Sequence, residues 1–219
     1  MTTSAKDEVL ARVRSALAAP GTHHPRTDSP QTAVSGIPTP TERTEVVDLF
    51  AERVADYRAV VERVGRSGVA QAIVAALAAH RAESVVVPEG LDDGWVAAVG
   101  AATRVVHERE VSSNAQLDGV DAVVSTAAVG MAVPGTIVLD HGPGQGRRAL
   151  TLVPDCHVCV VDVEQVVPDV PEGVARLRES VDAGRALTWI SGPSATSDIE
   201  LERVEGVHGP RTLHVLIVE

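Results

Sequence analysis

Apolar side chains recur every three or four positions near the start of the chain, and this spacing predicts two amphipathic helices. The first helix is predicted over residues 6–19. The second is predicted to begin at the capping box of residues 39–42, which also places a proline at the first helical position. Its apolar stripe runs from Val47 to Val64, and Gly65 is expected to end it.

The segment between these two helices has the composition of a linker. Residues 20–40 are rich in proline, threonine, serine and glycine, which favour turns and extended chain over packed elements. With 219 residues, the chain is long enough for one domain and an appended arm. We therefore predict an N-terminal helix and flexible linker at residues 1–38, followed by one domain at residues 39–219.

From residue 69 onward, helical and strand patterns alternate along the chain. Such an order predicts a mostly parallel sheet with helices on both faces. The helices are predicted at residues 69–80, near residues 92–101, and at a short segment capped by Ser113 and Gln116; the strands are predicted at residues 84–87, 103–108 and 121–129.

The middle of the chain has short apolar segments that lie too close together for helical crossovers, so we expect antiparallel hairpins there. These segments are residues 135–140, 149–153 and 157–163. After them the pattern predicts a helix at 171–183, a strand at 187–191, a short helix at 197–205 and a last strand at 213–218. The sequence therefore predicts an α/β domain with a mixed sheet flanked by helices and preceded by a helical arm.

Composition and charge exclude several classes of function. The chain has 30 acidic against 19 basic residues, a net charge of −11, which disfavours general binding to nucleic acid or to an anionic membrane. Lys6 is the only lysine, so a Walker phosphate loop or a Schiff-base catalyst is disfavoured. We find neither a secretory signal nor an apolar run of the roughly 18 residues that span a bilayer. We therefore expect a cytoplasmic protein.

The two cysteines, Cys156 and Cys159, have the CxxC spacing of a dithiol or of half a zinc site. Their surroundings predict a strand, however, and residues three apart on a strand point to opposite faces. We favour buried structural cysteines over a reactive pair or a metal site. An iron–sulfur cluster generally needs four thiolates, so we expect no such cofactor in this chain.

A glycine-rich segment at residues 141–148 permits two interpretations. Its glycines and the two arginines that follow are compatible with a phosphate cradle built from backbone N–H groups and cations. A loop that needs positive φ angles explains the same glycines, and we favour that interpretation. Since no helix is predicted after it, the segment is not a dinucleotide-binding fingerprint.

The C-terminal region carries the strongest candidates for chemistry. A strand is predicted to end at Ser191, and a loop of small residues then leads to a helix that begins near Ser197. Loops at the carboxyl ends of strands often bind ligands, and a helix N-terminus favours an anion. Ser194 and Thr196 offer hydroxyl groups there, and Arg211 offers a fork for a carboxylate or phosphate.

The remaining candidates in this region are His208 and Asp198. His208 offers a proton donor near neutral pH. Asp198 lies in the first turn of the predicted helix, beside a capping box of Ser197 and Glu200, so starting the helix explains it as well as catalysis does.

Two motifs in this region resemble those of the lactate-utilisation protein C family, the LUD domain proteins. They read SGPS-x-T-x-DIE from Ser191 and GVHGPR-x-LHV-x-IV from Gly206. Weaker matches lie upstream, and the resemblance covers roughly residues 42–219. These upstream matches are Gly130-x-Ala132, Gly135 to Val138, Arg148 to Pro154, and His157.

The resemblance implies a Rossmann-like mixed α/β core, similar to the superfamily of ribose-phosphate isomerases and CoA transferases. It further implies a subunit of a bacterial system that oxidises L-lactate to pyruvate together with two iron–sulfur proteins. On this reading no cofactor is expected in this chain, because the iron–sulfur clusters lie in the partner proteins.

One segment departs from the family pattern. Members usually carry an acidic residue and then Ser or Thr before the Gly-Thr pair, whereas this chain has Val133 and Pro134 before Gly135 and Thr136. Pro134 also lacks a backbone donor. Any activity that depends on this loop is therefore in doubt.

Together, the residues and the resemblance give one set of candidate site residues. We assign acid–base roles to His208 and Asp198, and binding of a small carboxylate or a partner to the others. The predicted binding residues are Ser191, Gly192, Ser194, Thr196, Gly209, Arg211, Gly135, Thr136 and His157. Two alternatives stay open: a stand-alone enzyme acting on a sugar phosphate or CoA ester, and a non-catalytic scaffold.

Overall fold

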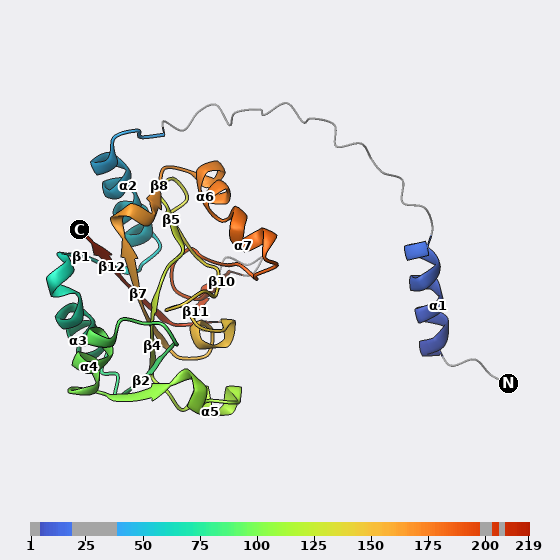
Figure 1. Cartoon of the computed structure of the whole chain (residues 1–219), viewed down its shortest axis with the longest axis horizontal. Helices are drawn as coiled ribbons and strands as arrows, with labels where there is room; N and C mark the ends of the chain where they lie inside the picture. Colours follow the sequence, from blue (N-terminus) through green and yellow to red (C-terminus); the bar gives the residue numbers. More distant parts are fainter. Residues whose placement is uncertain (1–4, 19–38, 198–202, 206–208) are drawn as a thin grey trace. The chain divides into compact units, whose positions relative to one another are not determined.

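The computed structural model describes residues 5–18, 39–197, 203–205 and 209–219. The chain divides into two compact units, Met1–Pro38 and Thr39–Glu219 (Figure 1). The first unit contains one helix, α1 (Ala5–Ala18), close to the range that the apolar spacing predicts. The second unit contains all the other described elements.

A six-stranded parallel sheet forms the centre of the second unit. Its strands follow the order β1-β12-β7-β4-β2-β3, and every neighbouring pair is parallel. The inner strands are rich in valine and almost wholly buried, as expected for strands covered on both faces. The strands are β1 (Val60–Val64), β2 (Ser84–Val87), β3 (Arg104–His107), β4 (Ala122–Thr126), β7 (Cys156–Asp162) and β12 (Thr212–Val218).

Helices cover one face of this sheet, and a helix with a second sheet covers the other. On β12, Leu216 and Val218 pack in the cluster that contains α3 and α4 residues, whereas Leu213 and Val215 pack in the cluster of α2. Short α5 packs its Leu117 against β2 and β4. The helices are α2 (Arg43–Asp56), α3 (Val69–Ala79), α4 (Asp93–Gly100) and α5 (Asn114–Asp118), and α5 begins with the predicted capping box.

A second, mixed sheet of four strands has the order β8-β5-β6-β9. Strand β6 is antiparallel to both β5 and β9, and β8 is parallel to β5. Helices α6 (Val170–Arg176) and α7 (Arg178–Asp182) follow β8, and Gly173 of α6 lies against Met131 of β5. The strands are β5 (Val129–Met131), β6 (Thr136–Leu139), β8 (Val166–Val167) and β9 (Thr188–Ile190).

The fold class is therefore confirmed as mixed α/β, but the predicted second helix is wrong in both its limits. It begins at Arg43, after Glu42, rather than at the 39–42 capping box, and it ends at Asp56. Arg58 then has a φ of 69°, which ends the helix, and residues 60–64 form strand β1. Their β-branched side chains favour a strand, and the partner strand β12 lies at the far end of the sequence.

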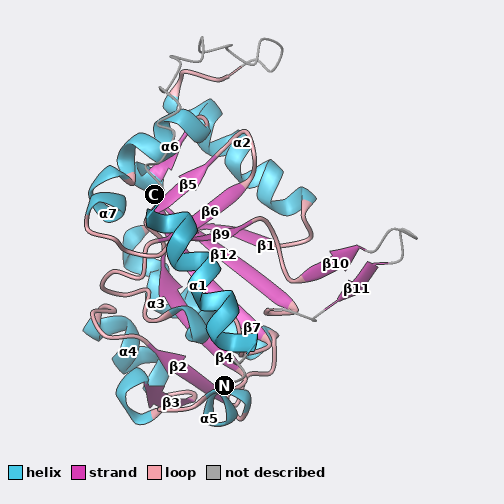
Figure 2. Cartoon of the chain, turned by 90° about the vertical axis from the view of Figure 1, so that its right-hand side faces the viewer, coloured by secondary structure: helices cyan, strands magenta, loops and turns pink. Residues whose placement is uncertain are grey.

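Several further predicted elements differ in the structure. The helix predicted at 171–183 is divided into α6 and α7, and the strand predicted at 121–129 ends at Thr126. Residues 148–151 form a 3-10 helix instead of a strand, and β7 joins the parallel sheet instead of a hairpin. The predicted helix at 197–205 is also wrong, because Ala195–Ser197 (β10) and Arg203–Glu205 (β11) pair as antiparallel strands. Figure 2 shows this hairpin beside the rest of the unit. Neither β10 nor β11 belongs to the two larger sheets.

The glycine-rich loop that follows β6 joins the ends of β2 and β4. Gly144, at a φ of 77°, donates its N–H to the carbonyl of Glu89, 2.8 Å away, and accepts a 2.8 Å hydrogen bond from the N–H of Thr126. The N–H of Gly142 donates to Asp140 at 3.1 Å. Because these donors are engaged within the protein, the loop interpretation explains the glycines better than a phosphate cradle.

Candidate functional site

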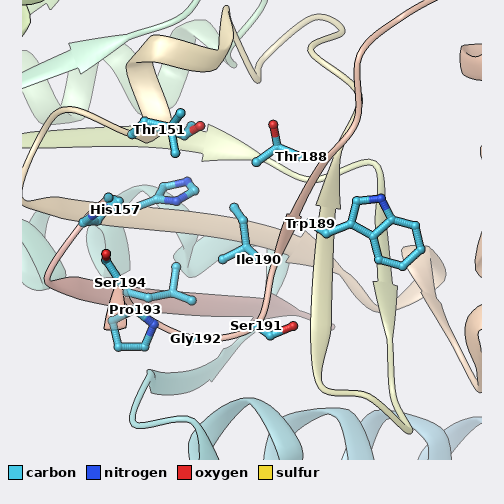
Figure 3. Close-up of a pocket in the computed structure, with 13 residues that line it drawn as sticks. Thr151, His157, Thr188, Trp189, Ile190, Ser191, Gly192, Pro193 and Ser194 are labelled. Atoms are coloured by element: carbon cyan, nitrogen blue, oxygen red, sulfur yellow. The ribbon is translucent and has the colours of Figure 1, made fainter. Parts of the chain in front are cut away.

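Five of the predicted binding residues line one hollow between the parallel sheet and strand β9. They are His157, Ser191, Gly192, Ser194 and Gly209. The hollow encloses about 480 Å³, including its open mouth. Figure 3 shows the ring of His157 and the loop from Ser191 to Ser194 around it.

The loop after β9 is fixed by two close contacts. Gly192 has a φ of 87°, and a Cβ at this position would lie 2.6 Å from Cβ of Tyr57, so only glycine fits. Farther along, the N–H of Ser194 donates to the carbonyl of Pro210 at 2.7 Å. This hydrogen bond joins the two halves of the C-terminal motif, which are separated by the β10–β11 hairpin.

His157 lies near the start of β7, with its side chain turned toward the hollow. Only 1% of the residue is exposed, and its Nε2 lies 2.8 Å from Oγ of Ser125 on the neighbouring strand β4. Burial lowers the pKa of His157 to about 4, so the imidazole is neutral at neutral pH. His157 therefore offers the hollow a hydrogen-bonding group without a charge.

Thr136 hydrogen-bonds to the same loop from strand β6, whereas Gly135 lies elsewhere. Oγ1 of Thr136 lies 2.7 Å from Oγ of Ser191, so β6 is linked to the end of β9. Gly135 instead lies against α2, where a Cβ would come within 2.7 Å of Cβ of Arg53. The structure therefore places Gly135 in the β5–β6 turn, away from the residues that line the hollow.

The departure from the family pattern falls in this same turn. Val133 donates its N–H to the carbonyl of Pro168 at 2.9 Å, and Gly135 donates to Ala132 at 3.0 Å. Pro134 belongs to the turn and is not among the lining residues. The Val-Pro pair therefore alters the β5–β6 connection and not the wall of the hollow.

Hydroxyl groups and apolar side chains make up most of the wall. The hydroxyls come from Thr151, Thr188, Ser191 and Ser194, and the apolar groups include Leu152, Ile190 and Leu213. Among the described lining residues, none carries a charged side chain. The hollow can thus hold a small ligand by hydrogen bonds and apolar contact, as small-molecule pockets commonly do.

Arg211, predicted to lie with these residues, faces a different cavity. Its Nε lies 3.6 Å from a carboxylate oxygen of Asp155, and it is not among the residues that line the hollow. The helix start predicted near Ser197 is wrong, because Ser197 ends strand β10, so the predicted anion site has no helix N-terminus at this residue. Thr196 lies on the same strand, and Asp198 and His208 fall outside the described residues.

Three polar residues that line or support the hollow were not predicted from the sequence, and neither were its apolar lining residues. Thr151 and Thr188 line the hollow, and Ser125 supports His157 from β4. A weak signal exists for Ser125, since it is a polar residue in a run of valines. Its role depends on the register of β4 and β7, which no local pattern specifies.

The two cysteines lie on opposite faces of β7, as predicted. Cys156 packs in the cluster that contains α3 residues and Cys159 in that of α2. Burial raises the pKa of each thiol to about 12. Within the described part of the chain, no group of three His, Cys, Asp or Glu residues could hold a metal ion, and no helix is long and apolar enough to cross a membrane.

Comparison with known proteins identifies similar chains. Residues 32–218 match the model of the LUD domain. A "Lactate utilization protein C" of Deinococcus radiodurans is 47% identical over 182 residues, covering 83% of this chain and 84% of that protein. A protein of the same name from Bacillus pumilus is 41% identical over 92 residues, 40% of this chain and 38% of that protein.

One solved structure is similar over most of the chain. It is the crystal structure of a "duf162 family protein" from Deinococcus radiodurans, with a TM-score of 0.70 and 41% sequence identity. The match covers 82% of this chain and all of that one.

Proposed function

The chain belongs to the LUD domain family, and from this premise we propose that it is a subunit of a bacterial system that oxidises L-lactate to pyruvate. Its partners in the proposal are two iron–sulfur proteins. The observation that carries it is the 47% identity to a lactate utilization protein C over most of both chains. This similarity supports a role in lactate utilisation. The oxidation of L-lactate to pyruvate and the two iron–sulfur partners are proposed in addition.

Oxidation of lactate removes two electrons, which need an acceptor. The chain has only two cysteines, and both are buried on opposite faces of one strand, so they cannot together hold a cluster. The proposal therefore assigns the redox centres to the partner proteins. It also places the chain in the cytoplasm, where unpaired cysteines stay reduced.

We assign the binding of this subunit's small ligand to the hollow. Its hydroxyl groups and the neutral His157 can donate and accept hydrogen bonds, while Leu152 and Ile190 provide apolar contact. The wall brings together residues from both halves of the C-terminal motif, since Ser194 and Gly209 come from opposite sides of the β10–β11 hairpin.

Complementation tests this proposal. A Deinococcus radiodurans strain that lacks its lactate utilization protein C should regain growth on L-lactate when it expresses this chain. Leu152→Trp, which fills the hollow, should abolish the rescue, whereas Val174→Trp on the exposed side of α6 should preserve it. Failure of the unmodified chain to restore growth, at normal expression, would contradict the proposal.

The same strains distinguish the parts of the proposal. If the Leu152→Trp variant still restores growth, the hollow is not needed for the function, and a non-catalytic scaffold is favoured. A pull-down of the tagged chain from lactate-grown cells should recover two cysteine-rich iron–sulfur proteins. Recovery of none would contradict the proposed partners.

A further inference from the structure

A second cavity lies at the amino-terminal edge of the parallel sheet, where β2, β4, β7 and β12 begin. It encloses about 960 Å³, including its open mouth. Cys156 and Thr212 face it, whereas their neighbours His157 and Leu213 face the hollow. The charged and titratable side chains that line it are His80, Arg81, Asp118, Asp121, Asp155 and Arg211.

A row of three titratable side chains leads into this cavity. His80, at the end of α3, places its Nε2 3.1 Å from Nδ1 of His214 on β12. On its other side, Nε2 of His214 lies 3.6 Å from a carboxylate oxygen of Glu62 on β1. His214 is only 5% exposed, and its Nε2 has no hydrogen-bond partner within the described part of the chain.

The order of this row sets the positions of the ring protons. A carboxylate can only accept, so Glu62 favours the tautomer of His214 with its proton on Nε2. The Nδ1 atom of His214 is then an acceptor, and His80 must donate to it from Nε2. In the neutral imidazole of His80, the other ring nitrogen, Nδ1, is then the acceptor.

Burial and the nearby His80 lower the pKa of His214, although Glu62 opposes this shift. A proton on both ring nitrogens of His214 is therefore disfavoured.

The charged groups of the cavity differ in how firmly they are held. Arg211 lies 3.6 Å from Asp155, and about two thirds of each side chain is exposed, so this ion pair is weak and exchangeable. Asp121 is engaged differently, because Oγ and N–H of Ser84 and the N–H of Glu83 all donate to it. An incoming carboxylate can therefore displace Asp155 and pair with Arg211 in this cavity.

Resting on the proposed function, we propose that this cavity binds a short-chain hydroxy acid, whose carboxylate pairs with Arg211 and whose hydroxyl donates a hydrogen bond to Nδ1 of His80. His214 and Glu62 are positioning residues, since they act through His80. The other charged side chains of the cavity, Arg81, Asp118, Asp121 and Asp155, sum to two negative charges, so the ligand's carboxylate competes with Asp155 for Arg211. This cavity is thus an acid-binding site in addition to the hollow, which has no charged group among its described lining residues.

Calorimetric titration of the full chain with L-lactate and propionate tests the ligand class. Propionate lacks the hydroxyl, and loss of one hydrogen bond should weaken its binding up to about tenfold relative to lactate. Arg211→Leu should weaken lactate binding at least about tenfold. Arg178→Leu, which removes an exposed arginine paired with Asp182 on α7, is the matched control and should leave binding unchanged.

Asp155→Asn provides a gain-of-function test. The change removes the carboxylate that competes for Arg211, so lactate should bind severalfold more tightly. Equal lactate affinities in the unmodified, Arg211→Leu and Asp155→Asn proteins would overturn the proposal. So would equal affinities for lactate and propionate.

Ring-nitrogen NMR spectra of the ¹⁵N-labelled protein test the positioning residues independently of binding. Both His80 and His214 should show the Nε2–H tautomer, and lactate should shift the Nδ1 signal of His80. Glu62→Ala should give His214 a mixture of tautomers without unfolding the protein. A proton on Nδ1 of His214 in the unmodified protein would overturn the arrangement.

These results separate the inference from the proposed function. A chain that restores growth on lactate but does not bind it at this cavity contradicts the inference alone. A chain that binds lactate here but fails to restore growth contradicts the proposed function and leaves the site standing.

Discussion

Acidification should destabilise this protein through His157 before most of its carboxylates are protonated. The residue is 1% exposed, and burial lowers its pKa from 6.5 to about 4. The unfolded chain therefore takes up a proton at a higher pH than the folded protein does. The stability due to the neutral imidazole is fully present above pH 6.5 and is lost as the pH falls from 6.5 toward 4.

The magnitude follows from the two pKa values. At pH 5.5 the unfolded state gains on the order of 1 kcal/mol from protonation, and at pH 4 the folded protein has lost about 3 kcal/mol in total. This is a large part of the roughly 5–15 kcal/mol that stabilises a typical domain. His214, whose pKa burial also lowers, adds a loss of the same sign.

Urea unfolding followed by the fluorescence of Trp95 and Trp189 measures the effect. The free energy of unfolding should be determined between pH 7 and pH 4 for the unmodified chain and for His157→Gln. The glutamine cannot titrate, while the carboxylates and His214 titrate in both proteins and cancel in the comparison. The unmodified chain should lose about 3 kcal/mol more than the variant over this range.

Parallel pH profiles for the two proteins would refute the reasoning. Parallel profiles would mean that the His157 imidazole is accessible to water or already charged in the folded protein. The hollow would then contain a titrating group. A change in the urea dependence of the variant would indicate an altered unfolded state and would have to be separated from the pH effect.

Three further predictions concern packing, thiols and a buried carboxylate. Gly130→Ala should destabilise the protein by about 1–3 kcal/mol in thermal or urea unfolding, because its Cβ would lie 2.9 Å from the ring of Phe50; an unchanged midpoint would contradict this. Cys156 and Cys159 should react with a disulfide reagent at pH 8 only after unfolding, since burial raises both pKa values to about 12; labelling in native buffer would show that the strand is exposed. Asp140→Ala should cost about 2–4 kcal/mol of unfolding free energy, because its carboxylate accepts hydrogen bonds from Gly142, Gln145 and Ser180 and also pairs with Arg185. A loss below about 0.5 kcal/mol would show that water replaces the carboxylate.

The strands and helices that the sequence predicts correctly are those whose signal is local. The short valine-rich strand β2 and the capping box of Ser113 and Gln116 are recognisable from their own residues. Residues 60–64 are different, since their apolar positions fit the end of a helix as well as a strand. Pairing with β12, more than 150 residues later, decides between the two, and no local pattern contains that information.

The candidate site was predicted only in part for a similar reason. The loop from Ser191 to Ser194 was found as a cluster of small residues, and the structure brings it to His157 and Gly209. Arg211 was grouped with them because it is close in sequence. The chain enters β12 at Thr212, and the alternation of a strand sends neighbouring side chains to opposite faces, which sequence distance does not convey.

One short segment at the start of β12 therefore contributes residues to two sites that differ in their charge. Leu213 and Gly209 contribute to a hollow without a charged group among its described lining residues, while Arg211 and Thr212 contribute to a cavity with several. Binding in these two places should respond differently to salt, because exposed ion pairs are screened and neutral hydrogen bonds are not. Raising the ionic strength from 0.05 M to 0.5 M should weaken lactate binding in the cavity severalfold and leave a ligand of the hollow unaffected. If lactate affinity does not change with salt, Arg211 is not the group that holds its carboxylate.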